Sequence, residues 1–406
     1  VSPKYIFMPD NYQTRRTIII TVAVVLVLLL GYALYRLLTS RTGGIIPRTS
    51  PQAPVGGLIN QPPIIPTTPD GVVITPLPSP TAGLEPVIKE QVLLPLTDFP
   101  VVSPVINKNQ DRVLLYKKDG GSVYTIDFAG NQNKISNITI VGLTDAIWSP
   151  TRDRAGVFYA DQEILKSFLH IGTSSVISFP RDVKSFSWSP DGKQFAYLIE
   201  NEIGLSLFIL DQSGKNSREA FKTPIRDAQI QWITTDTIVF QTAPSGQASG
   251  FVFIYSLKNG SFIRFLGPRF GLSTRWSPDG THVLVGFTNN AGHAYTFSLL
   301  DALGREAQKM DFITLPEKCA WVDKTEFYCA VPNAFPNTAV LPDDYLRGEV
   351  STQDRILSFS LDTQDTKLIF SGGAMDMDNL AVTEKKDYLI FLNRLDGIPW
   401  RLKLTQ

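Results

Sequence analysis

Apolar and polar residues alternate along most of the chain after residue 85, in runs of about five to eight residues. QFAYL, SLFILD, FVFIYSL and RILSFSLD are examples of such runs. A period of two predicts half-buried β-strands, and the short polar stretches between the runs predict tight turns between antiparallel strands. We therefore expect residues 85–406 to form an all-β domain.

One phrase recurs within this alternating region. SWSPDGKQFAYL begins at Ser187, RWSPDGTHVLVGF begins at Arg275, and a degenerate version, IWSPTRDRAGVFYA, begins at Ile147. The Ser-Pro-Asp-Gly sequence suits a tight turn, because proline presets φ at the first central position and glycine accepts the left-handed conformation that follows. Each phrase predicts a hairpin that joins a strand ending in tryptophan to an apolar second strand.

The tryptophans mark units of regular length. Equivalent positions recur at intervals of about 40 to 45 residues, with a last interval of about 60, and about 40 to 45 residues is the length of a four-stranded propeller blade. The pattern predicts a seven-bladed β-propeller, with six blades as the alternative because the first and last anchors are not tryptophan. The anchors are Ile106, Trp148, Trp188, Trp232, Trp276, Trp321 and Val382.

The two ends of this region complement each other. The last unit, NLAVTEKKDYLIFLNRLDGIPWRLKL, provides only three strands. The segment VIKEQVLLPL, residues 87–96, precedes the first unit, and we expect it to supply the missing outer strand. Such pairing closes the ring, whereas an open ring would leave bare strand edges.

The repeats resemble those of the TolB-like propeller family, whose blades carry Trp-Ser-Pro-Asp-Gly motifs. The units at Trp188 and Trp276 keep the whole motif, Trp148 keeps Trp-Ser-Pro, and Trp232 and Trp321 keep only the tryptophan. The resemblance covers residues 85–406 and implies a propeller fold and an exported location. It does not imply a Tol-system role, since nothing corresponds to the α/β domain that precedes the propeller in TolB, and propellers host many functions.

The region before the propeller divides into three parts. Residues 1–16 form a short tail, and residues 17–38 contain TIIITVAVVLVLLLGYALY. This apolar run of about 19 residues, as a helix, spans a hydrocarbon core of about 30 Å. Bulky residues follow it in place of a small-residue cleavage site, which predicts an uncleaved transmembrane helix in the lipid bilayer. Residues 39–84 are rich in Pro, Gly and Thr and read as a semi-extended linker, either a functional stalk or an unselected spacer.

Orientation in the membrane depends on other features, because basic residues flank both ends of the predicted helix. The only two cysteines, Cys319 and Cys329, should face each other across one hairpin. A disulfide there would imply an oxidising compartment, and two buried thiols are the alternative. With the exported location of the resembled family, this favours a single-pass protein of the cytoplasmic membrane with an extracytoplasmic propeller.

Composition and motifs argue against several classes of function. The 38 basic and 38 acidic residues balance, so a nucleic-acid partner receives no electrostatic support. The sequence contains no GxSxG, Gly-rich phosphate loop or HExxH motif, and its three histidines fall at different points of different units. We therefore expect no metal, no cofactor and no enzymatic activity.

Charged residues recur just before the predicted innermost strands, whose preceding loops open on one face around a central channel. Three successive units carry Arg181, Arg226 and Arg269 there, and the other units carry acids, namely Asp145, Glu317, Asp376 and Asp378. The hypothesis is a channel mouth with a basic and an acidic half, in which the arginines suit carboxylate or phosphate groups. In the alternative, Arg181 and Arg226 pair with the aspartates that follow them.

The insertion PNAFPNTAVLPDDYLRGEVST, residues 332–352, accounts for the long last interval and should lie on the same face. Loops longer than a fold requires often carry function. We expect it to be a docking loop, and the alternative is that it only caps the channel. Its expected contact residues are Phe335, Asp343, Asp344, Tyr345 and Arg347.

Taken together, these features indicate a membrane-anchored, extracytoplasmic β-propeller that binds another envelope protein or peptide as a binding or scaffolding module. The alternative is a propeller hydrolase or lyase that acts on an envelope glycan or peptide.

Overall fold

The computed structural model describes residues 72–73, 92–162, 164–179, 183–211 and 213–404, all within one compact unit. The predicted tail, the predicted transmembrane helix of residues 17–38 and most of the predicted linker lie outside these residues. No helix within the described ranges is long and apolar enough to cross a membrane. One part of the predicted linker is described, because Val72–Val73 form a two-residue strand, β1, that pairs with the strand β2 (Val92–Pro95).

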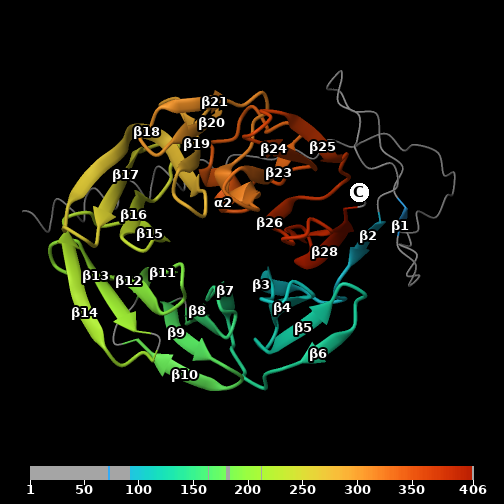
Figure 1. Ribbon diagram of the computed structural model, residues 1–406, viewed down its shortest axis with the longest axis horizontal. Coiled ribbons are helices and arrows are strands. Elements are labelled where there is room, and N and C mark those ends of the chain that lie inside the picture. The colour runs from blue at the N-terminus through green and yellow to red at the C-terminus, as the bar shows by residue number, and fades with distance from the viewer. Residues whose placement is uncertain (1–71, 74–91, 163, 180–182, 212, 405–406) are drawn as a thin grey trace, which may run out of the picture. The chain divides into compact units, whose positions relative to one another are not determined.

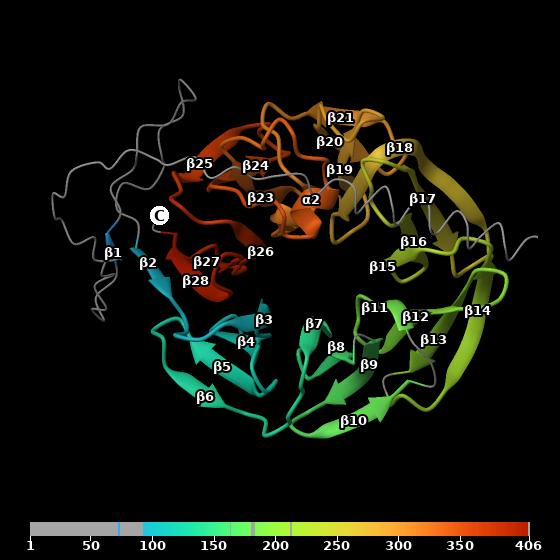
Figure 2. The same ribbon diagram turned by 180° about the vertical axis from the view of Figure 1, so that it is seen from behind.

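The described residues are almost entirely β-strands, which form antiparallel sheets arranged around a ring (Figures 1 and 2). Three successive four-stranded sheets open the ring. The first contains β3 (Val101–Ile106), β4 (Arg112–Lys117), β5 (Val123–Asp127) and β6 (Gln132–Lys134). The second contains β7 (Leu143–Trp148), β8 (Arg154–Asp161), β9 (Ile164–Ile171) and β10 (Ser175–Ser178). The third contains β11 (Val183–Trp188), β12 (Gln194–Glu200), β13 (Leu205–Asp211) and β14 (Ser217–Thr223).

A seven-stranded sheet follows, because one long strand belongs to two sequence units. The first part of β18 pairs with β17, and its last part pairs with β19, so the chain passes from an outer position to an inner position without a break. The strands are β15 (Ala228–Thr234), β16 (Thr237–Thr242), β17 (Ser249–Ser256), β18 (Phe262–Trp276), β19 (His282–Thr288), β20 (Thr296–Asp301) and β21 (Glu306–Lys309).

Two further sheets complete the ring. One contains β22 (Cys319–Trp321), β23 (Glu326–Pro332), β24 (Asp354–Ser360) and β25 (Thr366–Phe370). The last contains β26 (Met377–Val382), β27 (Tyr388–Asn393), β28 (Ile398–Lys403), β2 and β1. The short helices are η1 (Pro316–Lys318), directly before β22, and α2 (Asp343–Leu346), between β23 and β24.

The last sheet joins the two ends of the domain. Strand β2 pairs with β28, with Leu93 opposite Leu402, and both side chains are buried. The sequence led us to expect this pairing for residues 87–96, of which residues 87–91 lie outside the described part. On the inner side, Asn379 of β26 donates a hydrogen bond to the Pro104 carbonyl of β3 at 3.1 Å. The first and last sheets are therefore held together on the inner side, while β2 completes the last sheet on the outer side.

The repeated turns form as their sequence predicts. In the first full motif, the Ser189 hydroxyl and the Lys193 N–H donate to the Asp191 carboxylate at 2.7 and 3.1 Å, and Gly192 has φ of 70°. The Lys193 N–H is the largest cause that lowers the pKa of Asp191. This aspartate therefore serves the turn.

Neighbouring sheets are joined by the anchor tryptophans. The indole N–H of Trp148 donates to the Ser103 carbonyl of the preceding sheet at 2.9 Å, and that of Trp188 donates to Ile147 at 2.9 Å. Trp321 reaches the Arg275 carbonyl at 3.2 Å. Trp232 and Trp276 are as buried as Trp188, but their indole N–H groups have no partner among the described residues.

Because the indole of Trp188 donates a hydrogen bond and that of Trp232 donates none to any described residue, the two residues allow a matched comparison of variants. Trp188 and Trp232 are each 6% exposed, so replacement by phenylalanine removes similar apolar contacts from both. Only Trp188→Phe also removes a hydrogen bond, which contributes about 1 kcal/mol. We expect Trp188→Phe to lower the free energy of unfolding by about 1 kcal/mol more than Trp232→Phe in urea titrations. Equal losses in the two variants would show that the indole bond between sheets contributes nothing.

Candidate functional site

The connections between strands lie on two faces of the ring. Because each sheet is antiparallel, connections from an outer strand to the next inner strand share one face with the connections between second and third strands. We call this the mouth face. The Trp-Ser-Pro-Asp-Gly turns join first and second strands and therefore lie on the opposite face.

The insertion between β23 and β24, residues 333–353, is the longest connection on the mouth face among the described residues. It carries α2, which lies toward the inside of the ring in both views (Figures 1 and 2). The helix is only four residues long, and its first turn is acidic. Contacts with other parts of the ring therefore have to hold the insertion in place.

Two loops of the seven-stranded sheet hold the insertion on one side. Ser245 Oγ and the Gly246 N–H donate to the Asp343 carboxylate at 2.8 and 2.6 Å, and the Leu341 N–H donates to the Gly292 carbonyl at 2.9 Å. A Cβ at Gly246 would lie 2.5 Å from the Leu341 carbonyl oxygen, so only glycine allows this close approach. The insertion is thus fixed to connections that are far away in the sequence.

A buried lysine holds the other side. The side chain of Lys318, at the end of η1, has no exposed surface, and its Nζ lies 2.8 Å from both Asp354 Oδ2 and Asp376 Oδ1. Nζ also donates to the hydroxyl groups of Tyr345 and Thr352 at 2.8 and 3.0 Å. This group, which we call the Lys318 cluster, links η1, α2, β24 and the segment before β26.

The two aspartates of the Lys318 cluster titrate differently. Burial raises the pKa of Asp354, whose Oδ1 has no partner among the described residues, and the Lys318 ammonium opposes this only in part. Burial acts on Asp376 as well, but there Lys318 and the hydroxyl groups of Thr352 and Tyr345 outweigh it and lower the pKa. Asp376 is therefore the more firmly ionised partner of the lysine.

Arg394, on the turn after β27, extends the Lys318 cluster toward the last sheet. Its guanidinium lies 3.9 Å from the centre of the Tyr345 ring and donates to the Tyr345 carbonyl at 2.9 Å. It also lies 3.6 Å from Asp376 and 4.0 Å from Asp378. The insertion is consequently held by the seven-stranded sheet on one side and by the last sheet on the other.

A second charged group lies beside the Lys318 cluster and remains accessible to solvent. Arg275 of β18 is exposed and Glu317 of η1 is half-buried, and both interact electrostatically with Asp378 of β26. The protein around them lowers the pKa of Arg275 and raises the pKa of Glu317. Ser273 Oγ donates to Glu317 at 3.4 Å. Arg275, Glu317 and Asp378 thus form a partly accessible group of charges at the edge of the Lys318 cluster.

The described residues do not show the expected arc of three arginines at the channel mouth. Arg181 lies outside the described residues. Arg226 is exposed and donates to the Glu202 carbonyl at 3.4 Å. Arg269 belongs to β18 and not to a loop, and its guanidinium lies 4.3 Å from the centre of the Phe287 ring. The two described arginines thus contact their own neighbours, and the basic half of the channel mouth stays a hypothesis.

The acids of the expected other half separate into two kinds. Asp376 is 1% exposed, because it pairs with Lys318 beneath the insertion, so it does not line an open mouth. Asp145 accepts a hydrogen bond from Ser103 at 2.7 Å in the neighbouring sheet. Glu317 and Asp378 are the acids that remain accessible beside Arg275.

The expected contact residues of the insertion also differ in their environments. Tyr345 is 2% exposed and belongs to the Lys318 cluster, so its ring cannot touch a partner. Asp343 holds Ser245 and Gly246, while Asp344 accepts from the Val340 N–H and pairs with Arg347. The exposed Arg347 and the half-buried Phe335 remain available for contact.

Sequence reasoning missed Lys318, Asp354, Arg394 and Arg275. The one local signal for the cluster is a lysine placed directly before a buried strand in LPEKCAW. Within the described ranges, no group of three or more His, Cys, Asp or Glu residues is placed to hold a metal ion. In the neighbouring hairpin, Cys319 stands opposite Cys329 and the two form a disulfide.

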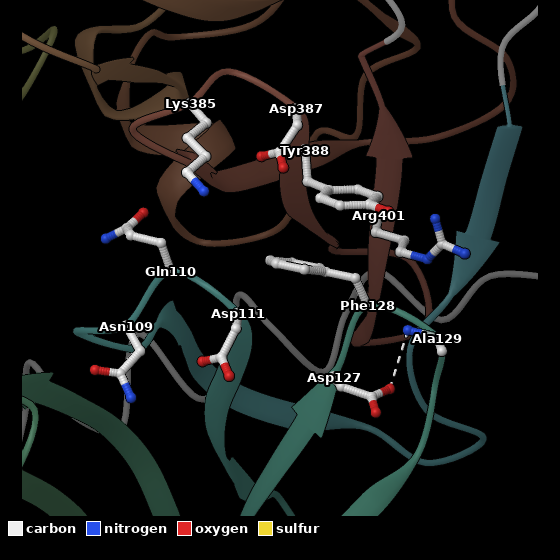
Figure 3. A pocket seen from close by; sticks show the side chains of 10 residues that line it. All are labelled: Asn109, Gln110, Asp111, Asp127, Phe128, Ala129, Lys385, Asp387, Tyr388 and Arg401. Carbon is white, nitrogen blue, oxygen red and sulfur yellow. Dashed lines mark hydrogen bonds between the residues drawn. The ribbon is translucent and has the colours of Figure 1, made fainter.

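A pocket of about 560 Å³ on the opposite face lies where the first and last sheets meet (Figure 3). Its rings stack, with Phe128 and Tyr388 4.3 Å apart and the Arg401 guanidinium 5.4 Å from Tyr388. The Asp127 carboxylate turns toward its own loop and accepts from the Ala129 N–H at 3.0 Å. Asp387 is likewise bound by the Thr383 hydroxyl group. These groups serve the junction between the sheets.

The comparisons with known proteins show the fold. No family model and no curated protein match the chain. An oligogalacturonate lyase solved with manganese is 11% identical, with 83% of this chain and 98% of that chain covered and a TM-score of 0.55. An oligogalacturonate lyase from Vibrio parahaemolyticus is 9% identical, with coverage of 83% and 99% and a TM-score of 0.54. TolB from Acinetobacter baumannii is 14% identical at a TM-score of 0.42, with 73% of this chain and 64% of the TolB chain covered.

Identities this low show the fold alone. The predicted all-β propeller fold is confirmed, while the likeness to the TolB-like family stays a resemblance of sequence motifs. The sequence predicted no enzymatic activity, yet lyases are among the proteins that share the fold. The comparisons therefore do not decide between a binding module and an enzyme, and the side chains on the mouth face have to be considered instead.

The Lys318 cluster generates a prediction about stability. Lys318→Met leaves Asp354 buried without its cation and Asp376 with only Arg394, 3.6 Å away, and removal of one partner from a buried ion pair costs about 3–5 kcal/mol. Lys386→Met is the control, because Lys386 pairs with Asp323 and Glu326 at the surface and its loss costs about 0–1 kcal/mol. Urea titrations measure both costs. Equal costs would contradict the role of the cluster.

The cost of Lys318→Met should also depend on pH. The pKa of Asp354 is already raised by burial and rises further without the ammonium, and Asp376 loses the main cation that lowers its pKa. The folded variant therefore binds more protons at Asp354 than the unfolded chain does. Its stability then falls as pH rises. We expect the difference from wild type to be smaller at pH 5 than at pH 8. A difference that is constant over this range would mean that the carboxylates are not buried as charges in the variant.

Proposed function

We propose that this chain is a single-pass protein of the cytoplasmic membrane whose extracytoplasmic, seven-bladed β-propeller acts as a binding or scaffolding module of the cell envelope. Its partner is another envelope protein or a peptide. The count of seven follows from one four-stranded blade per anchor, with the seven-stranded sheet counted as two blades that share β18. Residues 17–38 provide the membrane anchor in this proposal.

One observation carries the proposal: contacts with the ring hold the insertion on the mouth face with no partner present. Loops of the seven-stranded sheet hold Asp343, the Lys318 cluster holds Tyr345, and Arg394 holds the backbone of α2. A surface that is already ordered loses little conformational entropy on binding. A long, ordered loop on the face of a rigid scaffold is a typical position for recognition.

The distribution of exposed apolar residues supports the same face. Among the described connections and α2, five large apolar side chains that are at least 47% exposed lie on the mouth face, and one, Leu303, lies on the opposite face. Single exposed apolar residues are common on any protein, so the argument rests on this asymmetry. The five are Val141, Ile203, Ile313, Leu346 and Leu395.

The proposed location has two supports. The disulfide between Cys319 and Cys329 suits an oxidising compartment. The apolar run within residues 17–38 is long enough to cross a bilayer. Together they favour an N-terminal tail in the cytoplasm and a propeller outside it.

A hydrolase or lyase is the second candidate, and Glu317 is the observation that favours it. Its pKa is raised by burial, it lies beside Arg275 and Asp378, and it accepts from Ser273. General acid catalysis uses a carboxyl group of this kind. If the chain is an enzyme, Glu317→Gln abolishes turnover of an envelope glycan or peptide without any loss of partner binding.

The location is tested by alkylation in intact cells. Cells are quenched in acid and denatured, and Cys319 and Cys329 are then treated with a maleimide that adds mass, with and without prior reduction. Because the propeller is proposed to face an oxidising compartment, we expect both thiols to be labelled only after reduction. Labelling of both without reductant would contradict the extracytoplasmic location.

The function is tested by crosslinking and capture from native membranes. Leu346→Asp, combined with Arg347→Glu, replaces an apolar and a basic side chain at the exposed tip of the insertion by two acidic ones. We expect this double variant to lower recovery of the crosslinked partner at least about tenfold. Leu303→Asp is the matched control on the opposite face and should leave recovery unchanged. Circular dichroism checks that each variant is folded. Equal recovery from both variants would exclude the tip of the insertion as a site of binding.

A further inference from the structure

A groove lies beside the insertion on the mouth face. It is bounded by the connection between β19 and β20, by residues 311–313 before η1, and by the first residues of the insertion. Its volume of about 510 Å³ lies within the range of about 300–1,000 Å³ that is typical of ligand sites. We call it the mouth-face groove.

The floor of the mouth-face groove is apolar. Tyr295 and Phe312 are 7% and 6% exposed, and the Phe335 ring lies 6.5 Å from that of Tyr295. Ile313 stands at the rim with half of its surface exposed. Aromatic and aliphatic side chains in this arrangement bind an apolar group and exclude water from it.

Both walls of the groove carry backbone groups without partners. On one wall, the N–H groups of Ala334 and Phe335 donate no hydrogen bond to any described residue. On the other wall, the backbone N–H and C=O groups of residues 311–313 form no hydrogen bond with any described residue. Backbone N–H and C=O groups are strong donors and acceptors, so they favour hydrogen bonds with a ligand. An extended polypeptide offers a regular series of complementary groups, as in the addition of a strand to an exposed edge.

Side chains at the rim add further polar groups. The amides of Asn333 and Asn337 are exposed and have no partner among the described residues, and each amide both donates and accepts. His293 Nδ1 lies 2.8 Å from the Ala339 carbonyl, so Nδ1 carries the proton, and in the neutral ring Nε2 is an acceptor. These groups match a peptide backbone better than they match a lipid chain, which has no donors.

We propose that the mouth-face groove binds an extended peptide segment of the partner through its backbone, with an apolar side chain of that segment on the aromatic floor. Asp311 and Arg355, which carry opposite charges, both line the groove, so the groove favours neither a strongly acidic nor a strongly basic segment. This inference rests on the proposed function and names the part of the partner that the mouth face recognises.

An array of capped nine-residue peptides tests the proposal. The peptides differ only at their three central positions, which are apolar, acidic or basic, and the probe is the purified, labelled full-length chain in detergent. We expect the protein to be retained at least about fivefold more strongly on apolar centres than on charged centres, a difference that corresponds to about 1 kcal/mol. Absence of this preference would overturn the proposal.

Three variants locate the binding. Phe335→Ala removes part of the floor, and Asn337→Ala removes a polar group at the rim, so each should lower retention on apolar-centred peptides by about fivefold. Asn109→Ala is the matched control, since Asn109 is an exposed asparagine at the pocket on the opposite face. Retention that is unchanged in both Phe335→Ala and Asn337→Ala would overturn the assignment to this groove.

The array and the capture experiment fail independently. If no peptide is retained while Leu346→Asp with Arg347→Glu still loses the partner, the groove inference is overturned and the proposed function stands. If peptides are retained through Phe335 while Leu346→Asp with Arg347→Glu captures the partner as well as Leu303→Asp does, the groove inference stands, and the proposed role of the insertion tip is overturned.

Discussion

The arrangement of the mouth face depends on one buried ammonium group. Lys318 has no exposed side-chain surface, and Asp354, Asp376 and Tyr345 all lie within 2.8 Å of its Nζ. An unpaired charge at such a site would cost several kcal/mol, so these groups are held in place because each charge needs the others. Since they come from β24, the segment before β26 and α2, the lysine ties the insertion to two neighbouring sheets.

The rest of the ring provides a rigid support for this face. Indole N–H groups such as that of Trp188 reach the backbone of the preceding sheet, and β2 completes the last sheet by pairing with β28. Closure leaves few bare strand edges. The connections are then free to differ between sheets, and recognition or chemistry in a propeller is set by such connections and not by the fold.

The elements that the sequence predicted well depend on local patterns. Turn chemistry located the hairpins at Trp188 and Trp276, and Cys319 faces Cys329 across one hairpin as expected. The missing outer strand of the last unit identified the segment that contains β2. The Lys318 cluster could not be predicted, because its members are separated in the sequence and the burial of a charge leaves no periodic signal. For the same reason Tyr345 and Asp376 were expected at the surface. The motif GPRFG suggested a loop, whereas β18 continues through it as a strand.

The central claim is that the insertion is ordered before a partner binds, and hydrogen exchange of the free protein tests it most directly. The account predicts that the amides of residues 341, 344, 346 and 347, which donate to the carbonyl of Gly292 or to carbonyls within the insertion, exchange nearly as slowly as those of β23. Exchange as fast as that of the exposed turn between β20 and β21 would contradict the account, because the insertion would then become ordered only on binding.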